Sequence, residues 1–219
     1  MFPKYLKPVS NWFRVRRNAR LVLLIDHLHE KLGRPVAVLD VGGSYIFWQT
    51  VPNRNKCQIT LLNLEEAYRD GDGVPVEECG RYCAQVGDAR DLGRWDDAYF
   101  DLVTCNSVLE HLGLWTDMRK AAGELRRVGA HGWIQVPAFG FPVEQHLLLP
   151  CAHWFSEAVM TWLAWNLRRD LRKYGWEAVR ANVPYIKPLS MSELRRLFPG
   201  ARTWTEWFVV FPKSHLAQW

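Results

Sequence analysis

The chain contains four short apolar runs, and each ends at a polar residue or proline or just before a glycine. They are Val36–Val41, Gln58–Glu65, Phe100–Asn106 and Gly132–Pro137. Strands with near-continuous apolar sequence are typical of a parallel sheet covered on both faces, because the crossover connections place helices there. The pattern therefore predicts an α/β fold with a doubly wound, mostly parallel sheet of Rossmann-like type.

Apolar residues at helical spacing occur before and between these runs. Residues 10–33 carry leucine and isoleucine on one face and stop at Gly33-Arg34-Pro35, which predicts a helical N-terminal arm. A further helix is expected between the last two strands, with Thr116 or Asp117 as its N-cap and Gly129 at its end.

The pattern loosens between about Ala138 and Tyr185, where the sequence is aromatic and interrupted by proline. A helix near Ser156–Tyr174 predicts that this part is a helical insertion or lid. The chain then closes with a helix capped by Ser190 or Ser192 and a final pair of strands.

Composition narrows the class of protein. With 219 residues and 48% apolar composition the chain can bury a full core, so one domain is expected. No run of eighteen apolar residues and no signal peptide is found, which indicates the cytoplasm. Five cysteines without a matching histidine cluster indicate free thiols and no metal site.

The net charge of +5 is unevenly distributed, with basic clusters at the N-terminus and in the last third of the chain. Such clusters can attract phosphate or an anionic membrane surface, although a solvated face is the more common role. Nine of the twelve tryptophans lie after residue 110. Tryptophan suits a core edge, a ligand pocket or an interface, and composition does not choose among these.

Polar residues and glycines follow the predicted strands. Ligands of an open parallel sheet bind beyond the carboxyl ends of its strands, so these residues should converge. Glycine allows close approach of a ligand to the backbone, and an acidic or amide group about twenty residues later can accept hydrogen bonds from ribose. The set comprises Asp40, Gly42, Gly43, Ser44, Asn63, Glu65, Asp88, Ala89, Asn106, Ser107, Glu110 and His111.

Five segments in this order carry a resemblance to a known family. "VLDVGGS", "LLNLE", "VGDARDL", "FDLVTCNSVLEHLG" and "ELRRVGAHGWIQVP" resemble class I S-adenosylmethionine-dependent methyltransferases, in particular the group that modifies small molecules, lipids and sugars. The resemblance covers roughly residues 36–137, and "KPLSMSELRRLFPGA" fits the family's terminal helix and strands. It implies a single methyltransferase domain with an arm (1–35), a cofactor-binding core (36–137), a lid and substrate segment (138–188) and a terminal part (189–219).

The resemblance also implies roles toward S-adenosylmethionine. The glycine turn, with Asp40, Gly42, Gly43 and Ser44, would border the methionine part, and Asp40 would face the sulfonium or simply hold the turn. Asn63 or Glu65 would bind ribose, Asp88 with Ala89 would bind adenine, and Asn106 would complete the set. Two departures from the family pattern bear on cofactor affinity. Ser44 and Ile46 stand where the family has glycine, and Asn63 replaces the ribose-binding carboxylate.

Methyl transfer needs mainly in-line positioning, and a base only where the nucleophile is protonated. The segment "FGFPVEQHLLLPCAHWF" offers Glu144, His146 and His153, and His146 is the first candidate base. Glu144 and His111 are further candidates. A lone histidine among apolar residues is more often structural, and Glu110 with His111 could equally begin a helix packed on the sheet.

The predicted acceptor is a small molecule or glycan, most simply at a hydroxyl oxygen. An RNA methyltransferase and a non-catalytic adenosyl-binding protein are the alternatives. Nucleic acid is disfavoured, since no Asn-Pro-Pro-Tyr follows Asn106 and Pro150-Cys151 lies in the wrong segment for a catalytic cysteine. The stripe formed by Val159, Trp162, Leu163, Asn166 and Leu167 is expected to pack on the core as a lid. The alternative is peripheral membrane contact, which would suit a lipid-linked acceptor.

Overall fold

The computed structural model describes residues 7–64, 80–144, 147–183 and 186–219. The chain divides into two compact units. One comprises residues 1–104 and 127–133, and the other comprises residues 105–126 and 134–219.

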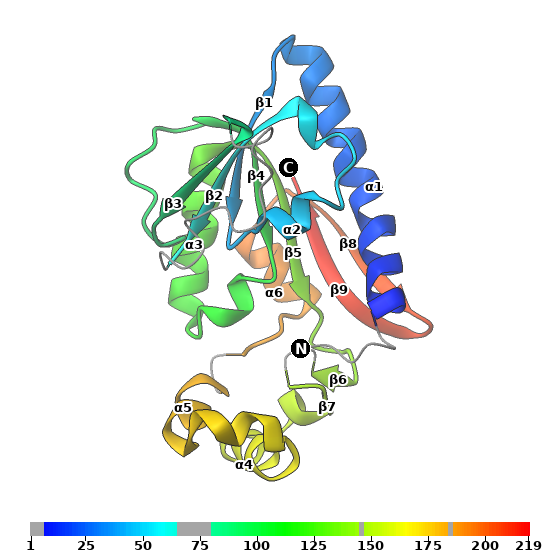
Figure 1. Ribbon diagram of the computed structural model, residues 1–219, viewed down its shortest axis with the longest axis vertical. Coiled ribbons are helices and arrows are strands. Elements are labelled where there is room, and N and C mark those ends of the chain that lie inside the picture. The colour runs from blue at the N-terminus through cyan, green and yellow to red at the C-terminus, as the bar shows by residue number, and fades with distance from the viewer. Residues whose placement is uncertain (1–6, 65–79, 145–146, 184–185) are drawn as a thin grey trace. The chain divides into compact units, whose positions relative to one another are not determined.

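The strands form a seven-stranded, mostly parallel sheet in the order β3-β2-β1-β4-β5-β9-β8 (Figure 1). Its strands are β1 (Val36–Val41), β2 (Cys57–Asn63), β3 (Tyr82–Val86), β4 (Phe100–Asn106), β5 (Gly129–Pro137), β8 (Arg202–Phe208) and β9 (Phe211–Gln218). β1 and β4 are neighbours in the sheet although they are not consecutive in the sequence. The order of the strands therefore reverses between β1 and β4. The predicted α/β fold with a mostly parallel sheet is confirmed.

In the first unit, β1 pairs in parallel with β2, and β2 pairs in parallel with β3. Helix α1 (Lys7–Leu32) packs on β1 and buries Leu21, Ile25 and Leu28, so the predicted N-terminal helix is confirmed. It ends before Gly33, whose φ of +65° is accessible to glycine at little cost. The short helices α2 (Tyr45–Trp48) and η2 (Arg54–Lys56) connect β1 to β2.

In the second unit, 3-10 helix η5 (Leu109–His111) precedes α3 (Trp115–Val128). Helix α3 begins one residue before Thr116, so the predicted caps Thr116 and Asp117 lie inside its first turn; its end directly before Gly129 agrees with the prediction. Helix α6 (Met191–Leu197) packs against the β8–β9 hairpin, which confirms the predicted final pair of strands. Ser190, rather than Ser192, is its N-cap, within a reciprocal capping box with Glu193.

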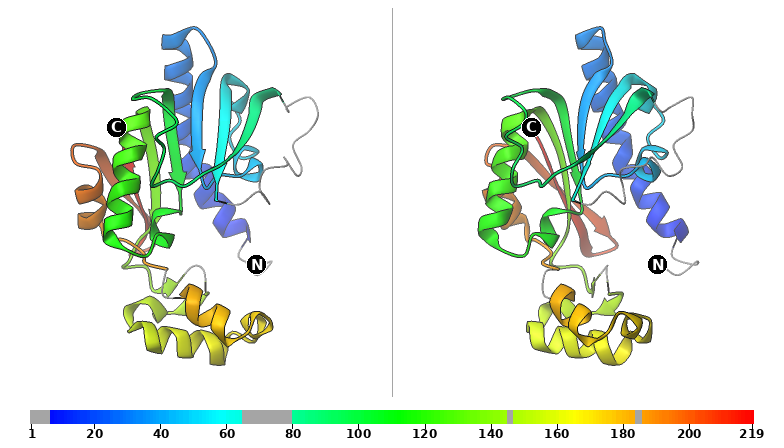
Figure 2. Two further views of the ribbon diagram at one scale, coloured as in Figure 1. Left: turned by 90° about the vertical axis from the view of Figure 1, so that its left-hand side faces the viewer. Right: turned by 60° about the vertical axis from the view of Figure 1, so that its left-hand side comes forward.

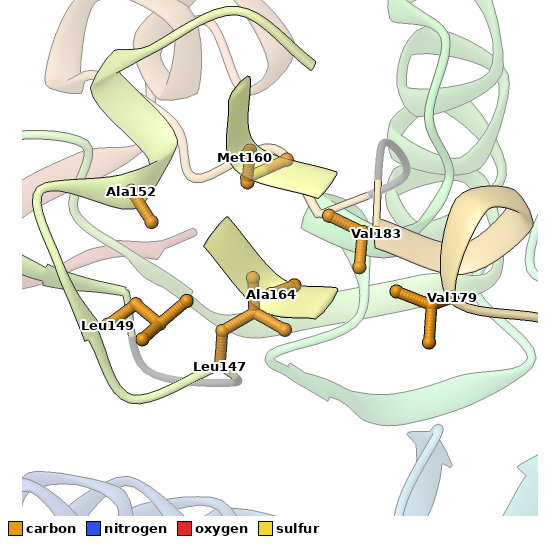
Figure 3. Close-up of a cluster of buried hydrophobic side chains, with 7 residues drawn as sticks. All are labelled: Leu147, Leu149, Ala152, Met160, Ala164, Val179 and Val183. Carbon is orange, nitrogen blue, oxygen red and sulfur yellow. The ribbon is translucent and has the colours of Figure 1, made fainter. Parts of the chain in front are cut away.

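The segment between β5 and α6 builds a small core of its own. It contains β6 (Val143–Glu144), β7 (Leu149–Pro150), η6 (Ala152–Trp154), α4 (Glu157–Leu167), η7 (Arg169–Tyr174) and α5 (Trp176–Asn182). Helices α4 and α5 lie side by side (Figure 2). Met160 and Ala164 of α4 meet Val179 of α5 and Val183, the residue after α5, in a buried apolar cluster (Figure 3).

Two expectations for this segment were wrong. The helix expected near Ser156–Tyr174 stops at Leu167, because the backbone at Arg168 leaves the helical region with φ −104° and ψ 81°. The expected buried stripe is largely exposed: Val159, Trp162 and Leu167 face solvent, and only Leu163 packs against the apolar cluster. Among the described residues, no helix has the length and apolar composition required to cross a bilayer.

Candidate functional site

The carboxyl ends of three parallel strands lie in register in the first unit. Val41 pairs with Leu62, and Asn63 pairs with Val86. The backbone continues this pairing beyond the strands, because the Gly42 amide donates to the Leu62 carbonyl over 2.8 Å and the Gly87 amide donates to the Asn63 carbonyl over 2.9 Å. The residues that follow β1, β2 and β3 are therefore brought together at one edge of the sheet.

The glycine turn after β1 has two separate structural requirements. Gly42 has a φ of +67°, in the region that favours glycine. Gly43 lies directly against the carboxylate of Asp40, since a Cβ at Gly43 would lie 1.7 Å from Asp40 Oδ2. The second glycine is thus explained by the close approach of Asp40, and Ser44 next to it makes no side-chain cap to α2.

Asp40 is a buried carboxylate at the end of β1, with 1% of its surface exposed. Its Oδ2 accepts a hydrogen bond from Trp48 Nε1 over 2.8 Å, and its Oδ1 accepts one from Thr104 Oγ1 over 2.7 Å. Burial raises the pKa of Asp40 to about 7, while these two hydrogen bonds act in the opposite direction. These contacts hold the glycine turn and α2 to the neighbouring strand.

Asn63 connects the end of β2 to the glycine turn. Its Nδ2 donates a hydrogen bond of 3.1 Å to the carbonyl of Gly43. An amide has both donor and acceptor atoms, so the same side chain can meet ribose hydroxyls while it holds the turn. Glu65, the other predicted ribose ligand, lies outside the described residues.

Asp88 follows β3 and is paired with a nearby arginine. Arg90 Nη2 lies 2.6 Å from Asp88 Oδ2, and the Arg90 amide donates to Oδ1 over 2.8 Å. The side-chain hydrogen bond from Arg90 lowers the pKa of Asp88, so this carboxylate is an ionised acceptor at neutral pH. Ala89 beside it is buried.

Asn106 has an unusual environment at the end of β4. Both polar atoms of its side chain are shielded from solvent and hydrogen-bond to none of the described residues. Ser107, the next residue, has a φ of +56° and is held by Gln135, which accepts from its amide over 2.9 Å and from its hydroxyl over 3.1 Å. A buried amide without partners at the carboxyl end of a strand is a candidate ligand-binding group.

The predicted catalytic candidates are not all described. His146 lies outside the described residues, and of Glu144 only the backbone, in β6, is described. His111 is exposed at the end of η5. Glu110 beside it is fully buried, and its carbonyl accepts a hydrogen bond of 2.8 Å from the amide of Lys187.

The second unit contains a pocket of about 520 Å³. Its wall combines apolar and aromatic side chains, namely Phe139, His153, Phe155, Met160 and Ile186, with polar groups that include Glu157, Lys187, Ser190 and Glu193. Volume and lining are typical of a small-molecule site. Sequence reasoning expected a substrate segment at 138–188 and named His153. It missed the contribution of residues 190–193, because these reach the pocket only through the pairing of Leu189 with Ala138.

His153 is oriented by the backbone. Its Nε2 lies 2.9 Å from the carbonyl of Phe139, which also accepts from Trp154 Nε1 over 2.8 Å. A carbonyl only accepts hydrogen bonds, so in neutral His153 the hydrogen is assigned to Nε2, and Nδ1 carries the lone pair. Within the described residues Nδ1 has no hydrogen-bond partner.

The chemistry of the first unit's strand-end edge fits an adenosyl ligand. The turn at Gly42 exposes backbone, Asn63 supplies an amide, and Asp88 supplies an ionised acceptor, all at the same edge. Among the described residues, no group of three or more histidine, cysteine, aspartate or glutamate side chains comes together as metal ligands would.

Comparison with known proteins gives a family match for part of the chain. Residues 39–134 match the family model described as a methyltransferase domain. This match confirms the resemblance of the chain to class I S-adenosylmethionine-dependent methyltransferases. No curated protein sequence matches the chain.

Solved structures share the fold at low sequence identity. A candidate O-methyltransferase from Nostoc punctiforme is 15% identical, with a TM-score of 0.53 and 92% of this chain covered. The bifunctional kinase-methyltransferase WbdD is 16% identical, with a TM-score of 0.58 and 92% covered. The methyltransferase domain of bacterial CtHen1 is 10% identical, with a TM-score of 0.56 and 94% covered. The chain spans 56% of the length of the first structure, 39% of the second and 97% of the third.

Proposed function

We propose that the protein transfers a methyl group from S-adenosylmethionine to a hydroxyl oxygen of a small-molecule or glycan acceptor. The observation that carries this proposal is the alignment of Gly42, Asn63 and Asp88 at one edge of three parallel strands. The methyltransferase-domain match over residues 39–134 supports methyl transfer, and the similarity to a candidate O-methyltransferase favours oxygen as the methylated atom.

Each cofactor-binding residue has a proposed role. The backbone of Gly42, Gly43 and Ser44 borders the methionine part, with Asp40 beneath the turn. Asn63 and Glu65 accept hydrogen bonds from ribose, and Asp88 accepts one from the adenine amino group beside Ala89. Asn106, which belongs to the second unit, stays a proposed cofactor-binding residue because its shielded amide has no partner among the described residues.

When bound, S-adenosylmethionine supplies a methyl group that its sulfonium already activates. The protein's own residues then have to orient the acceptor, exclude water and, for a hydroxyl acceptor, remove a proton. The aromatic walls of the pocket in the second unit, Phe139 and Phe155, suit the face of a sugar or aromatic ring, and Glu157 and Ser190 suit its hydroxyls.

His146, His111 and Glu144 remain the proposed candidates for the base, and we add His153 because it is oriented in the pocket wall by Phe139. Full turnover with an unchanged pH profile after His146→Ala would remove that residue from the set, and His153→Gln tests the fourth candidate in the same way.

Calorimetry and a transfer assay together test the function. The full chain is titrated with S-adenosylmethionine and S-adenosylhomocysteine, and is then incubated with isotope-labelled S-adenosylmethionine and a panel of hydroxylated acceptors for mass spectrometry. Binding of both ligands with labelled, base-stable ether products is expected. Binding without any product from the panel or from cell extract would instead indicate a non-catalytic adenosyl-binding protein, and no binding at all would overturn the proposal.

A further inference from the structure

Helix α4 buries one face and leaves the opposite face open. Met160, Thr161 and Ala164 are buried, and Met160 and Ala164 belong to the apolar cluster shared with α5 (Figure 3). Val159 and Trp162, which are neighbours at i and i+3, lie on the other face, and Trp162 exposes 59% of its surface. Because the inward face already supplies the packing of this helix, the outward tryptophan contributes nothing to the core.

Trp162 lies in a part of the chain that is rich in aromatic residues. Trp165, its i+3 neighbour on α4, is partly buried against the apolar cluster, and its ring meets that of Trp176 at 5.3 Å in an edge-to-face contact. Tyr174 precedes Trp176 by two residues, and both are exposed. These four residues, Trp162, Trp165, Tyr174 and Trp176, are called the tryptophan patch below.

The tryptophan patch is rimmed by positive charge. Residues 168–180 contain five basic and two acidic residues, a net charge of +3. The Arg172 guanidinium lies 5.8 Å from the centre of the Trp165 ring, and Lys173 Nζ lies 4.8 Å from the centre of the Tyr174 ring. Asp170 is already neutralised by Arg168 at 2.7 Å, and Arg169 has no ion-pair partner among the described residues. Arg172 and Lys173 therefore lie beside aromatic rings of the tryptophan patch.

We propose that the tryptophan patch docks the protein on the surface of an anionic lipid bilayer. Tryptophan and tyrosine prefer the headgroup level of a membrane, where an apolar ring and a polar N–H or O–H are both accommodated. The net positive charge of residues 168–180 complements anionic headgroups, and each basic residue near such a surface strengthens binding about fivefold. The patch thus has the two features of an interfacial anchor, aromatic area and matching charge.

Single-stranded nucleic acid also binds aromatic and basic residues, but it needs open ring faces on which bases can stack. The Trp165 ring has Arg172 over it and Trp176 against it, so this geometry favours the bilayer. The proposal rests only on the tryptophan patch and its basic neighbours, and it does not depend on methyl transfer.

Cosedimentation with vesicles tests the proposal. The full chain is mixed with phosphatidylcholine vesicles with and without phosphatidylglycerol, and the bound fraction is measured at low and high salt. We expect the full chain to bind the anionic vesicles. Trp162→Ser should weaken this binding roughly tenfold, because it removes the indole that the bilayer would bury. Lys173→Gln should weaken it about fivefold, at low salt only. Tyr99→Ser is the matched control, since Tyr99 is also 59% exposed but lies in the other unit.

Several outcomes would overturn the proposal. These are a failure of the full chain to sediment with anionic vesicles, an equal loss in Tyr99→Ser, and a concentration-dependent dimer in sedimentation velocity that Trp162→Ser abolishes. Binding of a single-stranded RNA oligonucleotide that Trp162→Ser abolishes, without vesicle binding, would assign the tryptophan patch to nucleic acid. Vesicle binding is measured without cofactor or acceptor, so failure of the methyltransferase proposal would leave this result unchanged.

Discussion

The indole of Trp48 donates a hydrogen bond to the carboxylate of Asp40 over 2.8 Å, and both side chains are buried. Asp40 is the last residue but one of β1, Trp48 ends α2, and Thr104 of β4 donates to the other carboxylate oxygen. Gly43 lies against the same group. One carboxylate therefore fixes the strand end, the glycine turn and the helix that follows it.

The first prediction concerns the pH dependence of folding. The pKa of Asp40 is about 7 in the folded state and near 3.8 when unfolded, so the folded state holds the proton more tightly. The contribution of Asp40 to stability is thus complete below about pH 4 and is lost as the pH rises to about 7. It is on the order of 3–4 kcal/mol over that range.

Asp40→Asn keeps the shape of the side chain and removes this titration. The free energy of unfolding of the wild type minus that of Asp40→Asn should therefore decrease as the pH rises from 5 to 7.5. Urea unfolding of both proteins at several pH values measures this difference. Parallel stability curves for the two proteins across that range would show that Asp40 titrates as an ordinary carboxyl.

The second prediction concerns the glycine turn. Gly43→Ala would place a Cβ within 1.7 Å of Asp40 Oδ2, so either the carboxylate or the turn must move. We expect a loss of about 1–3 kcal/mol in the free energy of unfolding. Gly123→Ala in α3 is the control, because a Cβ there meets nothing within 4 Å, and it should stabilise the protein by about 0.5–1 kcal/mol. Equal effects of the two substitutions would contradict the close contact at Asp40.

The α/β class and the mostly parallel sheet could be predicted, because buried parallel strands have near-continuous apolar sequence. Strand β3 was not among the expected strands. It lies at one end of the strand order, none of its five residues is fully buried, and "YCAQV" accordingly contains no leucine, isoleucine or phenylalanine. An edge strand needs little apolar sequence, so hydrophobic patterning gives no signal for it.

The orientation and pairing of individual side chains were harder to predict. Periodicity identified an apolar stripe on α4 but could not tell which side would be buried, because both sides of this helix are apolar. The small residues Thr161 and Ala164 face inward with Met160, while the large Trp162 faces outward. Likewise, the pairing of Asp88 with Arg90 depends on the loop conformation, for which the sequence has no periodic signal.

The third prediction distinguishes two serines as the cap of α6. Ser190 Oγ accepts from the Glu193 amide, and the Ser190 amide donates to Glu193 Oε2 over 2.7 Å. Ser190→Ala should lower the free energy of unfolding by about 1 kcal/mol. The substitution removes the acceptor of one amide at the start of the helix and breaks the reciprocal capping box that also holds the other. Within the described part of the chain, the Ser192 hydroxyl hydrogen-bonds to the Ser190 hydroxyl at 3.0 Å and to no helix amide, so Ser192→Ala should cost a few tenths of a kcal/mol at most. Thermal unfolding of the two variants measures the difference, and a larger loss for Ser192→Ala would reverse the assignment.

The fourth prediction tests the proposed adenine contact. Asp88 is an ionised acceptor because Arg90 lowers its pKa, so its contribution to ligand binding should be constant between pH 5 and pH 8. Asp88→Ala removes a charged hydrogen-bond acceptor and should weaken the binding of S-adenosylhomocysteine roughly tenfold in calorimetry. Asp97→Ala is the control, because the Asp97 side chain is 83% exposed and pairs only at the surface with Arg127. Unchanged affinity in Asp88→Ala, or an equal loss in Asp97→Ala, would show that Asp88 serves only its pairing with Arg90.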